Sequence, residues 1–62
     1  MNTGQLDVAR EQIDQAIATL QTARAELDGF RVYDAIGSVS IARLEALAAV
    51  IALQNAVTEE AA

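Results

Sequence analysis

The sequence contains no cysteine, histidine, proline, lysine or tryptophan, and it has one phenylalanine, one tyrosine and three glycines. Without cysteine and histidine the chain lacks disulfides and the ligands of nearly all transition-metal sites, so we expect no metal and no cofactor. Without proline, and with abundant alanine, the composition predicts helix almost throughout. We therefore expect an all-α protein that is stabilised by helix packing and oligomerisation.

Positive charge is also scarce, since four arginines stand against nine acidic residues for a net charge of −5. This balance repels phosphate backbones and anionic lipid headgroups, so we expect neither direct nucleic-acid binding nor membrane binding. The N-terminus has no basic segment followed by an apolar core. Arg43 and Glu45 interrupt the most apolar stretch short of the roughly 20 residues that cross a bilayer. The expected location is the cytoplasm.

The first half of the chain carries a heptad repeat. Large aliphatic residues and alanines alternate along it, each recurring every seven residues: Leu6, Ile13, Leu20 and Leu27, with Ala9, Ala16 and Ala23 between them. A stripe of alanines lets a second helix approach closely, because little side chain holds its backbone off. The pattern predicts a helix over about residues 4–28 in an antiparallel hairpin.

Asp28-Gly29 marks the end of this helix, because a glycine after the cap can take the left-handed conformation that closes a helix. A turn at residues 29–30 would then lead into a second helix over about residues 31–58. The two helices are nearly equal in length, as the arms of a hairpin should be. All 62 residues then belong to one helical-hairpin domain.

Gly37-Ser38 is the one possible interruption of the second helix. Glycine followed by serine can stop and restart a helix, which would leave a separate helical turn before residues 37–38. We favour a helix that runs through, since a glycine inside a helix costs only about 1 kcal/mol and packing can offset that cost.

The stretch from Ile41 to Val57 is too apolar for a single neighbour, because 13 of its 17 residues are apolar and they form two helical seams. The first seam comprises Ile36, Val39, Ala46, Val50, Leu53 and Val57, and the second comprises Leu44, Leu47 and Ile51. One helix covers about one narrow stripe, so we expect the first helix to cover one seam and a second copy of the chain the other. The expected assembly is a dimeric antiparallel four-helix bundle with the second helices at its centre. The predicted self-association residues are Ile36, Val39, Arg43, Leu44, Leu47, Val50, Ile51 and Leu53.

Arg43 lies among these apolar neighbours and has two interpretations. Its stem can pack on the seam while its head reaches solvent. Alternatively, it pairs with Asp34 or Glu45 of a partner chain, where a buried charge would fix the register of the interface.

Two further surfaces are candidates for binding a partner protein. Phe30, Arg31 and Tyr33 gather the two aromatics and an arginine at the hairpin tip, and such residues dominate interface hot spots. The alternative is that the two aromatic rings plug the ends of a bundle.

Asp7, Glu11 and Asp14 form an acidic edge on the first helix, at the spacing i, i+4 and i+7. This edge could dock a basic partner. It is also typical of a solvated face, because Arg10 can pair with Asp7 or Asp14.

The segment Arg10-Glu11-Gln12-Ile13-Asp14, followed by Arg24, resembles the first helix of the helical chorismate mutases over about a quarter of the chain. That resemblance would imply a dicarboxylate substrate held by cationic side chains. The sequence departs from the family in having no lysine and no third helix, and its second arginine comes a turn early. We therefore expect no enzyme.

The expected function is protein binding by a small acidic adaptor or inhibitor of the kind that phages encode, acting as a homo-oligomer on a larger protein. The alternative is a purely structural oligomerisation module, natural or designed, and the mutase-like enzyme is a lesser alternative.

Overall fold

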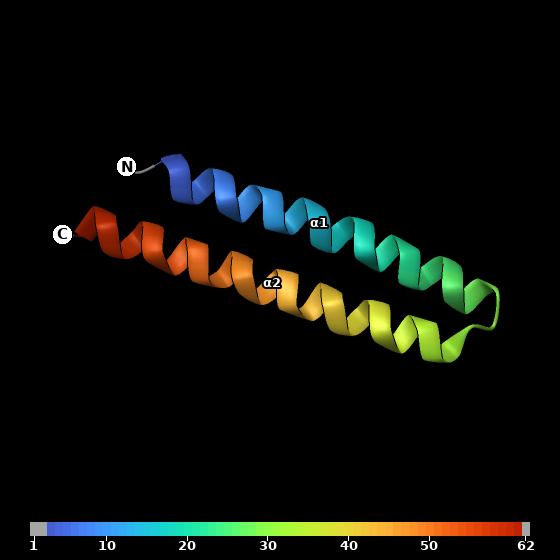
Figure 1. The fold of residues 1–62 in the computed structure, drawn as a ribbon. Helices are drawn as coiled ribbons and strands as arrows, with labels where there is room; N and C mark the ends of the chain where they lie inside the picture. The colour runs from blue at the N-terminus through green and yellow to red at the C-terminus, as the bar shows by residue number, and fades with distance from the viewer. Residues whose placement is uncertain (1–2, 62) are drawn as a thin grey trace.

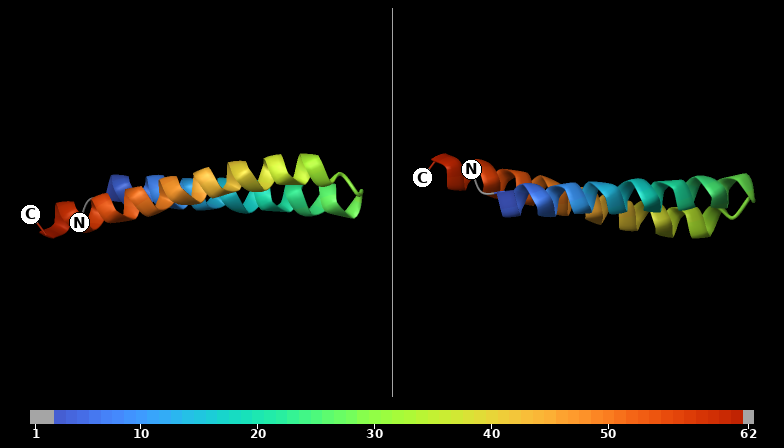
Figure 2. Two further views of the ribbon diagram at one scale, coloured as in Figure 1. Left: turned by 90° about the horizontal axis from the view of Figure 1, so that it is seen from below. Right: turned by 90° about the horizontal axis from the view of Figure 1, so that it is seen from above.

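The computed structural model describes residues 3–61, which form two antiparallel α-helices joined by a tight turn (Figure 1). Helix α1 spans Thr3–Asp28 and helix α2 spans Val32–Ala61. The Cα atoms extend over 49 × 13 × 9 Å, so the hairpin is a single layer of two helices. The edge-on views of Figure 2 show the two helices overlapping along their length. The predicted all-α helical hairpin is confirmed.

The two helices touch through alanine. Every buried residue in the described part of the chain is an alanine, and each is at most 8% exposed: Ala9, Ala16 and Ala23 on α1, and Ala35, Ala42, Ala49, Ala52 and Ala56 on α2. Seven-residue spacing on both helices is the spacing of a coiled coil, which keeps one stripe of each helix against the other along their whole length. The predicted alanine contact of the first helix is therefore present, and α2 contributes a matching stripe of buried alanines to it.

This contact corrects the expected packing of α2. We expected the first helix to cover one of the two seams, but α1 packs on a third stripe, which is made of alanine. A methyl group allows the two backbones to approach closely, whereas the larger side chains of either seam would hold the helices apart. As a result, the large aliphatic side chains of both seams are at least 43% exposed.

Helix α2 runs through Gly37 without a break and continues to Ala61, three residues past the expected end. A Cβ atom added to Gly37 would meet nothing within 4 Å. No close approach within the hairpin therefore requires glycine at this position.

The turn differs from its prediction by one residue. The N–H of Arg31 donates to the carbonyl of Glu26 at 2.8 Å, and the N–H of Phe30 donates to that of Leu27 at 3.0 Å. These two bonds form a Schellman motif in which Phe30 occupies the left-handed position, with φ 59°. Gly29 has a negative φ, so the expectation that it takes the left-handed conformation was wrong.

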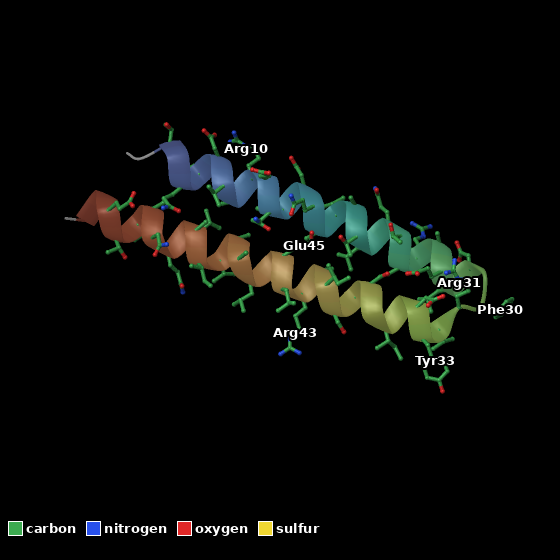
Figure 3. All side chains as sticks on the ribbon, viewed as in Figure 1. Arg10, Phe30, Arg31, Tyr33, Arg43 and Glu45 are labelled. Carbon is green, nitrogen blue, oxygen red and sulfur yellow. The ribbon has the colours of Figure 1, made fainter. Side chains whose placement is uncertain are left out.

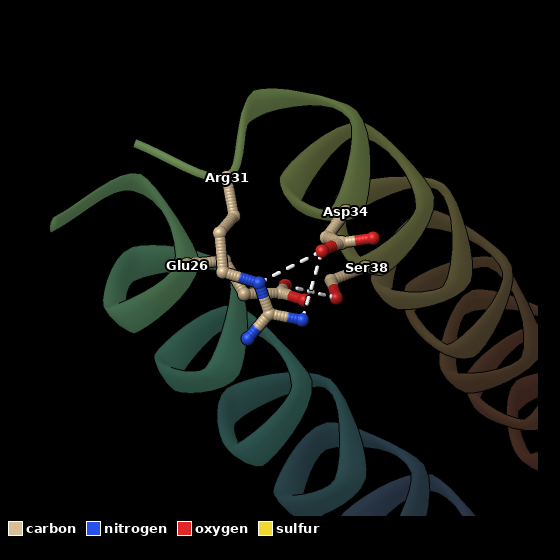
Figure 4. Close-up of polar contacts among 4 residues, drawn as sticks. All are labelled: Glu26, Arg31, Asp34 and Ser38. Atoms are coloured by element: carbon tan, nitrogen blue, oxygen red, sulfur yellow. Dashed lines mark hydrogen bonds and ion pairs between the residues drawn. The ribbon is translucent and has the colours of Figure 1, made fainter. Parts of the chain in front are cut away.

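Polar contacts join the helices along one side of the alanine stripe. The hydroxyl of Thr19 donates to Oε1 of Glu45 at 2.7 Å, and the hydroxyl of Ser38 donates to Oε1 of Glu26 (Figure 4). Both hydrogen bonds are partly buried and connect α1 with α2. Because they need one particular alignment of donors and acceptors, they help to fix the register of the hairpin.

Candidate interaction surfaces

Most of the large apolar residues gather on the side of the hairpin opposite these polar contacts. On both helices the polar contact residues come three positions after a buried alanine, and the large aliphatic residues of the opposite side come one or four positions after one, or three positions before one. In an antiparallel pair, equal offsets on the two helices point to the same side of the layer. We call this side the broad face; it comprises Leu6, Ile13, Ile17, Leu20, Leu27, Val32, Ile36, Val39, Arg43, Ala46, Val50, Leu53 and Val57.

A shallow groove between the helices shows that the broad face is continuous. Its lining comes from both helices and comprises Ala16, Leu20, Val39, Ala42, Arg43 and Ala46. Ala46 is the only small residue in a row that otherwise holds Val32, Val39 and Leu53, so the face is hollowed where alanine replaces a larger side chain. The broad face is thus a surface with ridges and a hollow, open to solvent along its length.

The second predicted seam lies elsewhere. Leu44, Leu47 and Ile51 are 49–65% exposed and form a ridge on α2, which we call the outer ridge. A separate shallow depression beside this ridge is lined by Ser40, Arg43, Leu44 and Leu47. The predicted self-association residues therefore divide between two surfaces: Ile36, Val39, Arg43, Val50 and Leu53 on the broad face, and Leu44, Leu47 and Ile51 on the outer ridge.

Arg43 lies on the border between these two surfaces. Its side chain extends away from both helices into solvent (Figure 3), and among the described residues it has no ion-pair partner. Within the hairpin the head of Arg43 is therefore solvated, and its pairing with Asp34 or Glu45 of a second chain stays a prediction. Glu45 is engaged with Thr19 across the helix contact.

The hairpin tip presents its aromatic side chains to solvent. Phe30 is 91% exposed and Tyr33 is 89% exposed, and in Figure 3 both rings point away from the helices. Arg31 donates from Nε to Oδ2 of Asp34 at 2.8 Å, and its Nη2 lies 2.8 Å from the same oxygen. Asp34 lies in the first turn of α2, where the helix dipole also favours a carboxylate. Neither ring plugs the hairpin core.

The acidic edge of Asp7, Glu11 and Asp14 is a solvated surface on α1. Its one ion pair joins Nη1 of Arg10 to Oδ1 of Asp7 at 3.7 Å, and both side chains are more than 70% exposed. An ion pair this long and this exposed contributes little to stability.

The residues that carry the resemblance to chorismate mutases do not converge. Arg10 and Arg24 are both on α1, 14 residues apart, which separates them by about 21 Å along the helix axis. Within residues 3–61, no group of three or more histidine, cysteine, aspartate or glutamate side chains could hold a metal ion.

Sequence reasoning missed the α1 half of the broad face and the polar contacts opposite it. A signal for both was present: Ala35, Ala42, Ala49 and Ala56 recur every seven residues, like the alanines of the first helix. Matching these two stripes would have placed Leu20 beside Val39 and Ala46. The signal was hard to see in α2 because alanines there are surrounded by other apolar residues.

Helix α2 also meets the length and composition of a membrane-spanning helix over Val32–Glu59, within which an 18-residue window has a mean hydropathy of 1.8. This segment is longer than the uninterrupted apolar stretch that the sequence suggested, although Arg43 and Glu45 lie near its middle.

The sequence matches no protein-family profile and no curated protein, and the fold matches no solved structure.

Proposed function

We propose that the protein is a small acidic protein-binding module, an adaptor or inhibitor, that acts as a homo-oligomer. One observation carries this proposal: apart from the half-buried Leu6, every large aliphatic side chain on the broad face and the outer ridge remains substantially exposed, and within the described part of the chain the buried core consists of alanine. In soluble proteins, contiguous apolar surface of this extent is characteristic of interaction sites. The hairpin therefore presents binding surface at the expense of a core of its own.

The surfaces divide naturally between self-association and partner binding. The broad face and the outer ridge supply apolar area, and the tip supplies two exposed rings with an arginine, a composition typical of interface hot spots. Phe30 supports a role for the tip, because a bulky residue holds a left-handed conformation there while its side chain is almost fully exposed in the hairpin. The acidic edge is a weaker candidate for a basic partner.

We propose that α2 packs within a protein assembly in the cytoplasm and does not span a bilayer. A charged side chain at the centre of a membrane-spanning helix costs about 2.5–3.5 kcal/mol in insertion scales. Arg43 and Glu45 would both bear that cost, and the bond between Glu45 and Thr19 would have to break. Packing α2 within a protein assembly avoids these costs.

A purely structural oligomerisation module is the second candidate. The observation that favours it is the regularity of the alanine contact, with the same seven-residue spacing on both helices. Such a module would self-associate and bind no other protein.

A matched pair of double variants distinguishes the two candidates. Arg31→Glu with Tyr33→Ala alters the tip, and Gln15→Glu with Val8→Ala alters α1 away from both the tip and the broad face. Each pair adds negative charge at an exposed position and shortens an exposed side chain.

Capture of a stoichiometric partner from host lysate should fail with the tip variant and persist with the control, at equal thermal stability. Loss of thermal stability in the tip variant alone would show that the aromatic rings pack in the assembled core. No partner for either variant or for the unmodified chain would favour the structural module.

A further inference from the structure

The hairpin exposes more surface than its mass requires. A compact monomer of 6.5 kDa exposes roughly 3,800 Å² of accessible surface, whereas this chain exposes 4579 Å². The difference of roughly 750 Å² is close to the about 800 Å² that each partner contributes to a standard protein interface. The radius of gyration is 14.4 Å, against about 10.6 Å for a compact chain of this length. The hairpin thus exposes extra area of about the size that a second layer would cover.

Of the apolar surfaces, the broad face has the shape that suits packing against a second layer. It is two helices wide and runs the length of the hairpin, whereas the outer ridge belongs to one helix. Rows of large side chains flank the alanine stripe, so two such faces can interlock with the knobs of one filling the spaces of the other. The groove around Ala46 lies near the middle of the hairpin, within reach of large side chains such as Ile17 and Leu20 from a facing layer.

We infer that a second copy of this chain covers the broad face, forming a two-layer, four-helix dimer in which both helices of each hairpin contact the partner. This inference rests on the proposed homo-oligomeric function and assigns the surface that serves it. An isologous contact of one face with itself closes as a dimer, because the same patch is used on both copies. Arg10 and Arg24 occupy the α1 edge of the face and give it the polar rim of a protein interface.

This arrangement differs from one with α2 helices alone at the centre, because it leaves the outer ridge and the tip uncovered. Leu44, Leu47, Phe30 and Tyr33 then stay exposed in the dimer, where a different protein can reach them. Self-association and partner binding would thus use different surfaces of the same hairpin.

Two glutamate substitutions test the assignment of the face. Leu20→Glu lies on the broad face and Leu44→Glu on the outer ridge; both leucines are about half to two-thirds exposed in the hairpin, and leucine and glutamate have similar helix propensities. A charge buried at the dimer contact should raise the dissociation constant of Leu20→Glu at least about 100-fold. Leu44→Glu should sediment as the unmodified dimer does. The opposite result would assign self-association to the outer ridge and overturn the inference, while leaving the proposed oligomeric function intact.

Thiol labelling provides a second test that does not depend on the Leu20 variant folding. The chain has no cysteine, so Ala46→Cys and Ser40→Cys each introduce a single thiol, and both positions are exposed in the hairpin. The maleimide reaction of Ala46→Cys should slow at least about 10-fold between monomeric and dimeric concentrations, because the contact excludes solvent there. Ser40→Cys, which lies on the other side of α2, should react at the same rate throughout. Protection at Ser40→Cys alone would contradict the inference.

Flotation with phosphatidylcholine vesicles tests whether a lipid bilayer, instead of a second copy of the chain, covers the broad face. The unmodified chain should remain with the soluble fraction as a dimer. A chain that floats with the vesicles as a monomer would overturn both this inference and the proposed homo-oligomer. A folded monomer that stays in solution would overturn them as well.

Discussion

Replacing Phe30 with glycine should stabilise the protein, because the turn places a positive φ at this residue and glycine adopts positive φ without steric cost. Phe30 has φ 59°, and its ring is 91% exposed, so the ring contributes little burial within the hairpin. A left-handed conformation costs roughly 1–2 kcal/mol for a residue with a Cβ atom. Glycine removes that cost but loses about 0.4–1 kcal/mol through its greater freedom in the unfolded chain.

The expected net gain for Phe30→Gly is on the order of 1 kcal/mol, which raises Tm by about 4–8 °C for a domain of this size. Thermal unfolding followed by circular dichroism measures this shift, with all proteins at one chain concentration because self-association also affects Tm. Phe30→Ala is the matched control: it removes the ring but keeps a Cβ atom in the left-handed position, so its Tm should change little.

A lower Tm for both variants would refute this reasoning, since it would show that the ring packs against something in the assembled protein. A higher Tm for Phe30→Gly together with loss of partner capture would indicate that the strain is tolerated because the ring serves binding. Phe30→Ala should lose the partner too, which separates the role of the ring from that of the backbone.

Two further substitutions test the helix contact and a third tests helix α2, each by thermal or chemical unfolding. Ala16→Leu should cost at least about 1–3 kcal/mol because it forces the close helices apart, whereas Ala18→Leu on the exposed side should cost little; equal effects would contradict the alanine contact. Thr19→Val should cost about 1 kcal/mol through the lost interhelical hydrogen bond, and Thr22→Val, whose hydroxyl bonds only within its own helix, serves as the control. Gly37→Ala should stabilise α2 by about 1 kcal/mol without weakening self-association, and a weakened dimer would mean that another helix crosses closely at this position.

The hairpin was predictable because it follows from local rules. The absence of proline, the alanine heptads of the first half and the punctuation near Gly29 determine two helices and a turn. The exact closing residue was not predictable from residue preference, because the Schellman hydrogen bonds place Phe30 where preference favours glycine. Conformational propensity gives the backbone angles that each residue adopts most readily. Phe30 departs from its propensity by adopting a positive φ.

The partner stripe on α2 was harder to choose than the stripe on α1. Nearly every direction around α2 is apolar, so hydrophobic periodicity does not single out one face. The choice depends on how closely two backbones can approach, which favours Ala35, Ala42 and Ala49 over larger residues. The apolar pattern showed that α2 needed more than one partner, but not which stripe α1 would take.

The polar contacts depend on register, which the sequence alone left undetermined. Thr19 and Glu45 are 26 residues apart and meet only because the alanine stripes align. In the sequence, Glu45 only interrupts an apolar stretch. In the hairpin its carboxylate accepts a hydrogen bond from the Thr19 hydroxyl on the other helix.

Whether a hairpin with an alanine core requires a second layer is tested most directly by following mass and helicity together on dilution of the unmodified chain. Sedimentation equilibrium gives the mass and circular dichroism gives the helicity, over the same range from high micromolar to sub-micromolar concentration. We predict a mass of twice 6.5 kDa at the upper end, with helicity falling as the dimer dissociates. A 6.5 kDa species that keeps full helicity at every concentration would contradict the claim that a second copy covers the broad face.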